Sequence, residues 1–488
     1  MQKWRTVGLG LIVARLAACG GTDAANLPSG TKDAEAACTA STCDDNNACT
    51  TDSCDPDSGV CSHVTLSDGT SCTDLGVCLV GGACKGGVCT GGQDVLWTRT
   101  FGSAEKESAS DIVATRDGGL VVIGSKQSTI TGEGNVWLVR ISQTGALMWD
   151  RTYPGNEVTY GGGIVQTSDD GFAFFSANGA ELRLTRVDSD GNENWTRKYG
   201  EARGVGGIVG TNDGGFALGL SVAITANDDN FWLLRTDASG SKLWDRNFGD
   251  KYEQHGEAIV QTSDGGFALG GRTFSHTMGD GWLVRTDEQG NALWEHEYGT
   301  ALQDSIDGMA LTSDGGFALV GLTIIDIGVM RAWFVRTDAN GTELWRTLYG
   351  VSNETNAYSV IQNDDGGFFL AGETSQKGAG SQDVWLVRTD SKGATVADWT
   401  FGTAASESGY VIAKVGTHGL AITGPTSSNG GDYFVVRTDL FGNTSCATSG
   451  ACVSKTVSAC DDGDPCTRDG CTVGKCTNVK PQFTSCPP

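Results

Sequence analysis

A unit of about fifty residues recurs along the middle of the chain and restricts the fold more than any other feature. Its clearest copy runs from Ala258 to Gly299 and holds four short β-rich runs, IVQT, FALGG, WLVRT and LWEHEYG. Turns of the forms SDGG and D-x-x-G join the first two and the last two runs, and a variable loop joins the middle two. Each unit is therefore predicted to be a four-stranded antiparallel sheet with strands a to d in chain order.

Three kinds of residue mark successive units. The a–b turn centres on Asp117, Asp169, Asp213, Asp264, Asp314 and Asp365, and its seventh copy is the degenerate Gly416-Thr417-His418-Gly419. Strand c carries Arg140, Arg186, Arg235, Arg285, Arg336, Arg388 and Arg437. Strand d carries Trp97, Trp149, Trp195, Trp244, Trp294, Trp345 and Trp399. Because a residue present in every unit usually supports the scaffold, we predict structural roles for the tryptophans and the arginines.

The arginines have more than one candidate partner. Arg285 and Asp287 are two residues apart on one strand and so point to the same face, which favours an ion pair repeated in every unit. The turn of the next unit is a second candidate partner. The alternative function is a ring of seven arginines that lines a central channel and grips an anion.

The last unit lacks its own strand d, and the missing strand lies at the other end of the repeat. Residues Asp94 to Gly102, DVLWTRTFG, form a strand of the d type that contains Trp97 and precedes the first strand a. A first strand that completes the last unit closes a ring and removes the sheet edges. The predicted fold is all-β, a seven-bladed β-propeller of four-stranded blades over residues 93–445, with small disulfide-rich modules at both ends.

The string D-x-x-G-x-x-L-W, from Asp287 to Trp294, resembles the tryptophan-docking motif of quinoprotein-like propellers. It is also similar to that of the lipoprotein propeller in the outer-membrane barrel-assembly machinery. The resemblance implies that each indole packs between neighbouring blades. Quinoproteins of this kind place a vicinal disulfide beside their cofactor, whereas the propeller region here contains no cysteine. No cofactor is therefore expected.

The N-terminus has the features of a bacterial export signal. Lys3 and Arg5 precede a short apolar run, and Leu16-Ala17-Ala18-Cys19 resembles a lipobox. The resemblance implies a signal peptide over residues 1–18, a lipid anchor on Cys19 and a tether over residues 19–37. The expected location is the cell envelope, as an outer-membrane lipoprotein that is periplasmic or surface-exposed. The alternative is an ordinary secretory signal followed by an incidental cysteine.

Cysteines are confined to two segments that bracket the repeat, residues 38–92 and 446–488. CDDNNACTTDSC in the first and CDDGDPCTRDGC in the second are copies of one pattern. They resemble the extracellular repeats of slime-mould proteins and of large bacterial surface proteins, which implies an oxidising, extracellular setting. Calcium is a candidate ligand of the aspartate clusters, although ordered turns explain them equally well.

Each module has an odd number of cysteines once Cys19 is set aside, so either both keep a free thiol or one bridge joins them. Cys89 and Cys446 flank the propeller where its ring closes, and we predict a disulfide between them that locks the ring.

Charge and motifs limit the function. The net charge is −25, which disfavours nucleic acid as a partner. The sequence has no catalytic motif and no metal-ligand spacing, so we predict a non-enzymatic lipoprotein that binds an envelope protein or polysaccharide. The contact face is predicted to be that of the b–c and d–a loops, whose b–c members vary at 125–135, 221–230, 322–331 and 374–383. The alternatives are a secreted propeller enzyme, a glycoside hydrolase or lyase that assembles carboxylates from different blades, and a structural surface protein.

Overall fold

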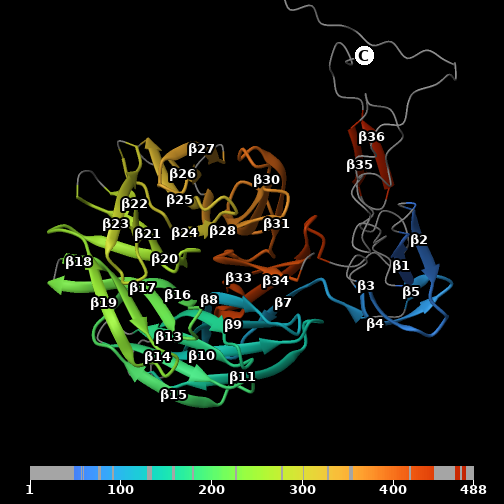
Figure 1. The fold of residues 1–488 in the computed structure, drawn as a ribbon, viewed down its shortest axis with the longest axis horizontal. Helices are drawn as coiled ribbons and strands as arrows, with labels where there is room; N and C mark the ends of the chain where they lie inside the picture. Colours follow the sequence, from blue (N-terminus) through green and yellow to red (C-terminus); the bar gives the residue numbers. More distant parts are fainter. Residues whose placement is uncertain are drawn as a thin grey trace, which may run out of the picture. The chain divides into compact units, whose positions relative to one another are not determined.

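Seven antiparallel sheets of four strands each surround a common axis in the computed structural model of the chain (Figure 1). The innermost strands of neighbouring sheets contact one another around the whole ring, so each sheet is one blade of a closed propeller. The expected seven-bladed all-β fold is thereby confirmed. The structure describes residues 49–55, 58, 60–74, 79–90, 93–128, 134–155, 160–177, 181–225, 228–275, 279–300, 302–326, 329–350, 355–416, 419–444, 468–472 and 475–479.

Strands a to d of each blade follow one another from the axis outward (Figure 1). Blade 1 comprises β8 (Lys106–Ala114), β9 (Leu120–Gln127), β10 (Gly134–Ile141) and β11 (Leu147–Tyr153). Blade 2 comprises β12 (Tyr160–Gln166), β13 (Phe172–Ala177), β14 (Leu182–Val187) and β15 (Glu193–Lys198). Blade 3 comprises β16 (Arg203–Gly210), β17 (Phe216–Thr225), β18 (Asp228–Thr236) and β19 (Lys242–Phe248).

The next three blades repeat this order. Blade 4 comprises β20 (Gln254–Gln261), β21 (Phe267–Thr273), β22 (Asp280–Thr286) and β23 (Ala292–Tyr298). Blade 5 comprises β24 (Gly308–Leu311), β25 (Phe317–Asp326), β26 (Val329–Thr337) and β27 (Glu343–Tyr349). Blade 6 comprises β28 (Thr355–Gln362), β29 (Phe368–Thr374), β30 (Asp383–Thr389) and β31 (Thr395–Phe401).

Blade 7 is assembled from both ends of the repeat, as the sequence predicts. Its first three strands are β32 (Val411–Val415), β33 (Gly419–Thr426) and β34 (Asp432–Asp439), with the short helix η2 (Ser428–Gly430) before β34. Its fourth strand is β7 (Trp97–Phe101), which pairs antiparallel to β34 with Trp97 opposite Arg437. Since β7 begins and β34 ends at the face of the a–b and c–d turns, the chain enters and leaves the propeller on that face.

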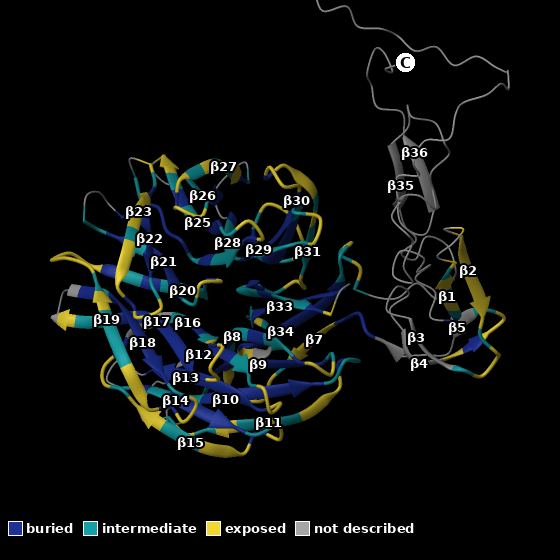
Figure 2. Ribbon diagram, in the orientation of Figure 1, coloured by how far each residue is buried: buried dark blue, intermediate teal, exposed yellow. Residues whose placement is uncertain are grey.

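The hydrophobic core is divided into seven clusters, one at each blade interface. Successive residues of a strand point to opposite faces of its sheet, so each strand b serves two interfaces. In β9, Leu120 and Val122 pack against blade 7, whereas Val121 and Ile123 pack against blade 2. Strands b and c are accordingly buried and strand d is the most exposed (Figure 2). Burial on both faces explains why these strands are apolar throughout rather than alternating.

The N-terminal module contains short strands and disulfides. β1 (Thr50–Cys54) and β2 (Cys61–Thr65) form a hairpin, and Cys54 and Cys61 are both disulfide-bonded. A second small sheet contains β3 (Ser71–Asp74), β4 (Leu79–Lys85), β5 (Val88–Thr90) and β6 (Gln93–Asp94).

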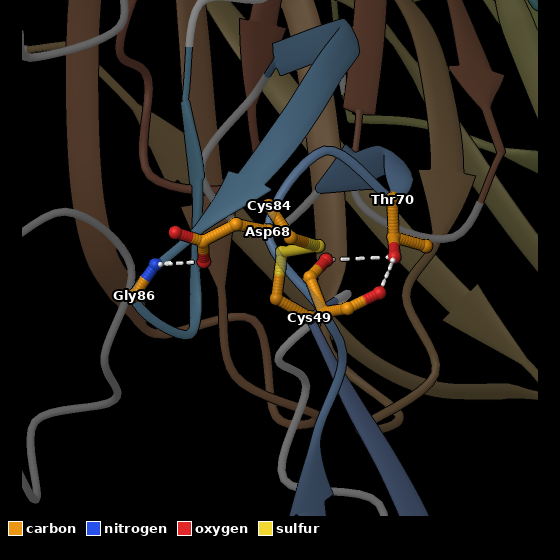
Figure 3. Close-up of a disulfide and its surroundings, with 6 residues drawn as sticks. Cys49, Asp68, Thr70, Cys84 and Gly86 are labelled. Carbon is orange, nitrogen blue, oxygen red and sulfur yellow. Dashed lines mark hydrogen bonds between the residues drawn. A yellow bond between two sulfur atoms is a disulfide. The ribbon is translucent and has the colours of Figure 1, made fainter.

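A disulfide joins Cys49 to Cys84 of β4, with an S–S distance of 2.05 Å (Figure 3). The loop beside it is held by the Gly86 amide, which donates to Asp68 Oδ1 at 2.7 Å, and by the Thr70 hydroxyl, which donates to the Ser67 carbonyl at 2.7 Å (Figure 3). The disulfide framework predicted for this module is thus present in its described part.

The C-terminal module contains one described hairpin, β35 (Arg468–Thr472) and β36 (Lys475–Val479). Residues 1–18, the lipidation candidate Cys19, the tether over 19–37 and Cys446 lie outside the described residues, so these predictions remain open. Within the described ranges no helix has the length and apolar character needed to cross a membrane.

Candidate functional site

Six blades tie their a–b turn to strand c through an arginine. In blade 4, Arg285 Nη2 lies 2.6 Å from both carboxylate oxygens of Asp264. The equivalent pairs are Arg140–Asp117, Arg186–Asp169, Arg235–Asp213, Arg336–Asp314 and Arg388–Asp365. Arg285 therefore pairs with the turn of its own blade, and neither Asp287 nor the turn of the next blade is its partner. Strand c is also the third strand from the axis, so these arginines do not line the channel.

The turn carboxylates are fixed in their ionised form. A hydrogen bond from the Thr211 hydroxyl and the Arg235 guanidinium lower the pKa of Asp213 to about 2. In each such pair, the positive charge of the arginine and the negative charge of the aspartate compensate each other within one blade. The arrangement suits a scaffold contact and leaves no free charge for a ligand.

The tryptophans of strand d lie against the c–d turn of the following blade. Gly290 in blade 4 has a φ of +77°, and a Cβ there would lie 2.5 Å from Cζ3 of Trp244 in blade 3. The Trp149 indole of blade 1 donates to the Ser189 carbonyl in blade 2 at 3.1 Å, and Trp97 donates to the Gln143 carbonyl at 3.1 Å. Only a residue without a side chain leaves room for the ring, which accounts for the glycine of D-x-x-G.

Trp399 departs from the register of the other six tryptophans. Each of those lies opposite the strand c arginine of its blade, whereas Ala397 faces Arg388 in blade 6 and Trp399 faces Leu386. The displaced ring still meets the next turn, because a Cβ on Gly442 would lie 2.5 Å from its Cδ2 and Cε2 atoms. Trp399 therefore reaches the same neighbour from a position two residues further along the strand.

A carboxylate pair forms at the inner strands of blades 4 and 5. Glu257 is the bulged residue of β20, between Gly256 and Ala258, and Asp307 directly precedes β24. Burial raises the pKa of Glu257 to about 8, and the Asp307 carboxylate adds to the rise while Arg272 opposes it. Burial also raises the pKa of Asp307 to about 6, against a hydrogen bond from Ser305 and the charge of Arg272.

A second polar cluster lies at the inner strands of blades 6 and 7. The Tyr358 hydroxyl donates to Glu373 Oε1 at 2.9 Å, and the Asn356 amide donates to the same oxygen at 3.1 Å. Ser408 donates to the other oxygen, and the ring of Tyr410 lies 5.2 Å from that of Tyr358. Burial and the Glu373 carboxylate raise the pKa of Tyr358. This tyrosine is held as a hydrogen-bond donor, which is the opposite of an activated nucleophile.

The two clusters differ in what they can do chemically. Glu373 has donors on both oxygens and supports the structure. Glycoside hydrolysis uses a carboxylic acid with a raised pKa together with a second carboxylate, and of the two clusters Glu257 with Asp307 is the one that combines two acids with raised pKa values. Among the described residues, no group of three or more histidine, cysteine, aspartate or glutamate side chains is arranged to hold a metal ion.

Extended hairpins form part of the variable face. The b–c strands β17 and β25 are ten residues long, and the exposed fractions of Ile224 and Ile325 near their tips are 46% and 39%. Tyr252, in the d–a loop that precedes blade 4, is 41% exposed. The predicted loop at 374–383 is described throughout, whereas residues 129–133, 226–227 and 327–328 of the other variable loops lie outside the described ranges.

Sequence reasoning missed the residues of the inner strands. Glu257 and Tyr358 each occupy a β-bulge, and Ser110 does so in blade 1. The sequence did contain one signal for these residues. At the bulged position of strand a, the residue type differs from unit to unit. A bulge shifts the alternation by one residue, so the pattern alone did not show where these side chains lie.

One known family is similar to part of each cysteine-rich module. A family model described as the Dictyostelium (slime mold) repeat matches residues 42–66 and 459–480. The expected resemblance of the two modules to this repeat is therefore supported. No curated protein matches the sequence.

Several solved structures match the chain at low identity. A protein of unknown function from Bacteroides caccae is 14% identical, with a TM-score of 0.36 over 61% of this chain and 94% of its own. The Pan2 WD40 domain of Neurospora crassa is 11% identical, with a TM-score of 0.44 over 67% and 88%. A mutant NanB sialidase of Streptococcus pneumoniae is 10% identical, with a TM-score of 0.42 over 72% and 71%.

Proposed function

We propose that the chain is a non-enzymatic lipoprotein of the bacterial cell envelope that binds a protein or polysaccharide through the b–c and d–a loops. The observation that carries this proposal is the pair of ten-residue hairpin strands in blades 3 and 5, with Ile224 and Ile325 exposed near their tips. Binding residues are concentrated on loops that a rigid scaffold holds in place, and these two hairpins carry exposed apolar side chains there. On the opposite face, six of the seven a–b turns have an aspartate that is already paired with the strand c arginine.

The position at which the chain enters and leaves the propeller supports the choice of the loop face as the contact face. The chain enters and leaves the propeller on the face of the a–b and c–d turns, where Trp97 lies opposite Arg437. A lipid on Cys19 would therefore be tethered through that face and leave the hairpins accessible. The Cys49–Cys84 disulfide fits the oxidising compartment that this location requires.

Affinity capture from solubilised cell envelope tests the proposal, with residues 20–488 as bait and the disulfides intact. The test variant is Ile224→Ser with Ile325→Ser. The matched control is Leu243→Ser with Leu344→Ser, which removes two leucines of similar exposure, 53% and 55%, from the outer strands. We expect one abundant partner to be retained by the wild type and the control and lost by the test variant. Equal capture by all three proteins would contradict the proposal.

The alternative function is a glycan-active enzyme, and the carboxylate pair favours it. Glu257 and Asp307 come from neighbouring blades, as the alternative requires, and both pKa values are raised. Hydrolysis of envelope polysaccharides by the wild type, lost in both Glu257→Gln and Asp307→Asn, would establish it. If no hydrolysis is found and the test variant loses the captured partner, the binding function is supported and the enzymatic alternative is excluded.

A further inference from the structure

The seventh a–b turn lacks the aspartate of the other six. Arg285 lies opposite Ala268 and Arg437 lies opposite Ala421 in their respective sheets. Asp264 stands four residues before Ala268, whereas the residue four before Ala421 is Thr417. Blade 7 therefore repeats the strand c arginine without its carboxylate.

Arg437 is nevertheless buried. Its exposed fraction is 4%, close to the 5–8% of five of the six paired arginines. Its Nη1 atom donates to the Gly118 carbonyl of blade 1 at 2.6 Å, while its Nε atom has no hydrogen-bond partner in the described part of the chain. No described carboxylate forms an ion pair with it. A buried guanidinium in this state is costly unless an anion compensates it.

A cavity of about 270 Å³ lies beside this guanidinium, at the seam between blades 7 and 1. Val95, Leu96 and Val415 give it apolar walls, and Arg437 and the backbone of Gly118 line it as well. The cavity thus combines one uncompensated cation with an apolar surface.

The other charged groups of the cavity wall are compensated within the propeller. Arg116 pairs with Asp170 at 2.6 Å, and Asp117 pairs with Arg140. Asp439 accepts hydrogen bonds from the amides of the c–d turn, as Asp287 does in blade 4. Compared with its six counterparts, the seam therefore lacks one negative charge, at Arg437.

We propose that this cavity binds a small aliphatic carboxylate, whose charged end pairs with Arg437 in place of the missing turn aspartate. The six paired blades show that an arginine at this position binds a carboxylate. In blade 4, Arg285 Nη2 donates to both carboxylate oxygens of Asp264 at 2.6 Å. The apolar walls select a ligand with a short hydrocarbon group. Burial lowers the pKa of Arg437 to about 10, so the guanidinium remains charged at neutral pH. The site lies on the face opposite the hairpins and is independent of the proposed function.

Isothermal titration of the full chain with sodium butyrate tests the site, with butyramide as the uncharged analogue. We expect saturable binding of butyrate with a millimolar Kd, as befits a ligand of about six heavy atoms, and none of butyramide. Arg437→Gln should weaken binding at least tenfold. Absence of saturable binding by the wild type, or equal binding of the amide, would overturn the proposal.

Two further variants test the site even if Arg437→Gln does not fold. Thr417 stands at the sequence position of the turn aspartate, so Thr417→Asp restores the residue that the other six turns have, and Thr417→Asn is its uncharged match. We expect Thr417→Asp to raise the unfolding temperature and to weaken butyrate binding at least tenfold, while Thr417→Asn binds as the wild type does. Equal butyrate affinity in the two variants would refute the assignment. The Ile224→Ser, Ile325→Ser variant should bind butyrate normally, which separates this site from the capture surface.

Discussion

The raised pKa of Glu257 contributes to the pH dependence of the propeller's stability, and Glu257→Gln should remove that contribution. The folded protein holds this proton more tightly than the unfolded chain, since the pKa is about 8 in the fold and 4.5 in the unfolded reference. The free energy of unfolding contributed by Glu257 therefore falls as the pH rises from about 4.5 to about 8 and is constant outside that window.

The magnitude follows from the same two values. Their difference corresponds to about 5 kcal/mol for a fully desolvated group. The side chain is only partly buried, so solvent screening reduces the expected effect to about 2 kcal/mol. Glu257→Gln should match the wild type near pH 4 and exceed its stability by about this amount near pH 9.

Urea unfolding at the two pH values, with the disulfides intact, measures this difference. The control is Glu288→Gln, an exposed residue of the c–d turn in the same blade, and it should follow the wild type at both pH values. If Glu257→Gln differs from the wild type by the same amount at both pH values, the argument that burial holds the proton on Glu257 is wrong.

Three further predictions concern the repeated contacts. Trp294→Ala should lower the free energy of unfolding by about 3–5 kcal/mol in urea titration, because the indole fills a blade interface. Gly290→Ala should cost clearly more than Gly265→Ala, since both have positive φ but only the first would place a Cβ at 2.5 Å from Trp244; equal costs would argue against close docking of the ring. Asp213→Asn should lose about 0.5–1 kcal/mol at pH 7 and nothing near pH 2, because the stability from a lowered pKa disappears as the pH falls from about 4 to about 2.

The architecture was predictable because marker residues at fixed positions show where the strands of each unit lie. The aspartate of the turn, the arginine of strand c and the tryptophan of strand d recur at fixed spacing, and the split last unit implies closure through Trp97. The partner of Arg285 was not predictable in the same way. Asp264 and Asp287 are both repeated, and the choice between them depends on how strand b brings the turn beside strand c.

The inner strands were less predictable for a different physical reason. Their bulges break the period of two that relates sequence to side-chain direction, so Glu257 and Tyr358 could not be assigned to a face. The raised pKa values also depend on neighbours from the next blade, as with Asp307 beside Glu257. Such contacts come from the closed ring and are absent from any single unit.

Seven identical blades would present seven identical surroundings, and a ring of that kind offers no preferred place for an asymmetric ligand. Binding specificity must therefore arise where the units differ. Arg437 has lost its turn aspartate, Glu257 and Asp307 bring acids to two inner strands, and the hairpins that carry Ile224 and Ile325 are longer than their counterparts. Each departure has a cost in free energy that the regular unit avoids. The cost comes from an unpaired cation, a desolvated carboxyl group or an exposed isoleucine. A ligand that offsets one of these costs would bind there in preference to any regular blade, which is why the variants above are aimed at these positions.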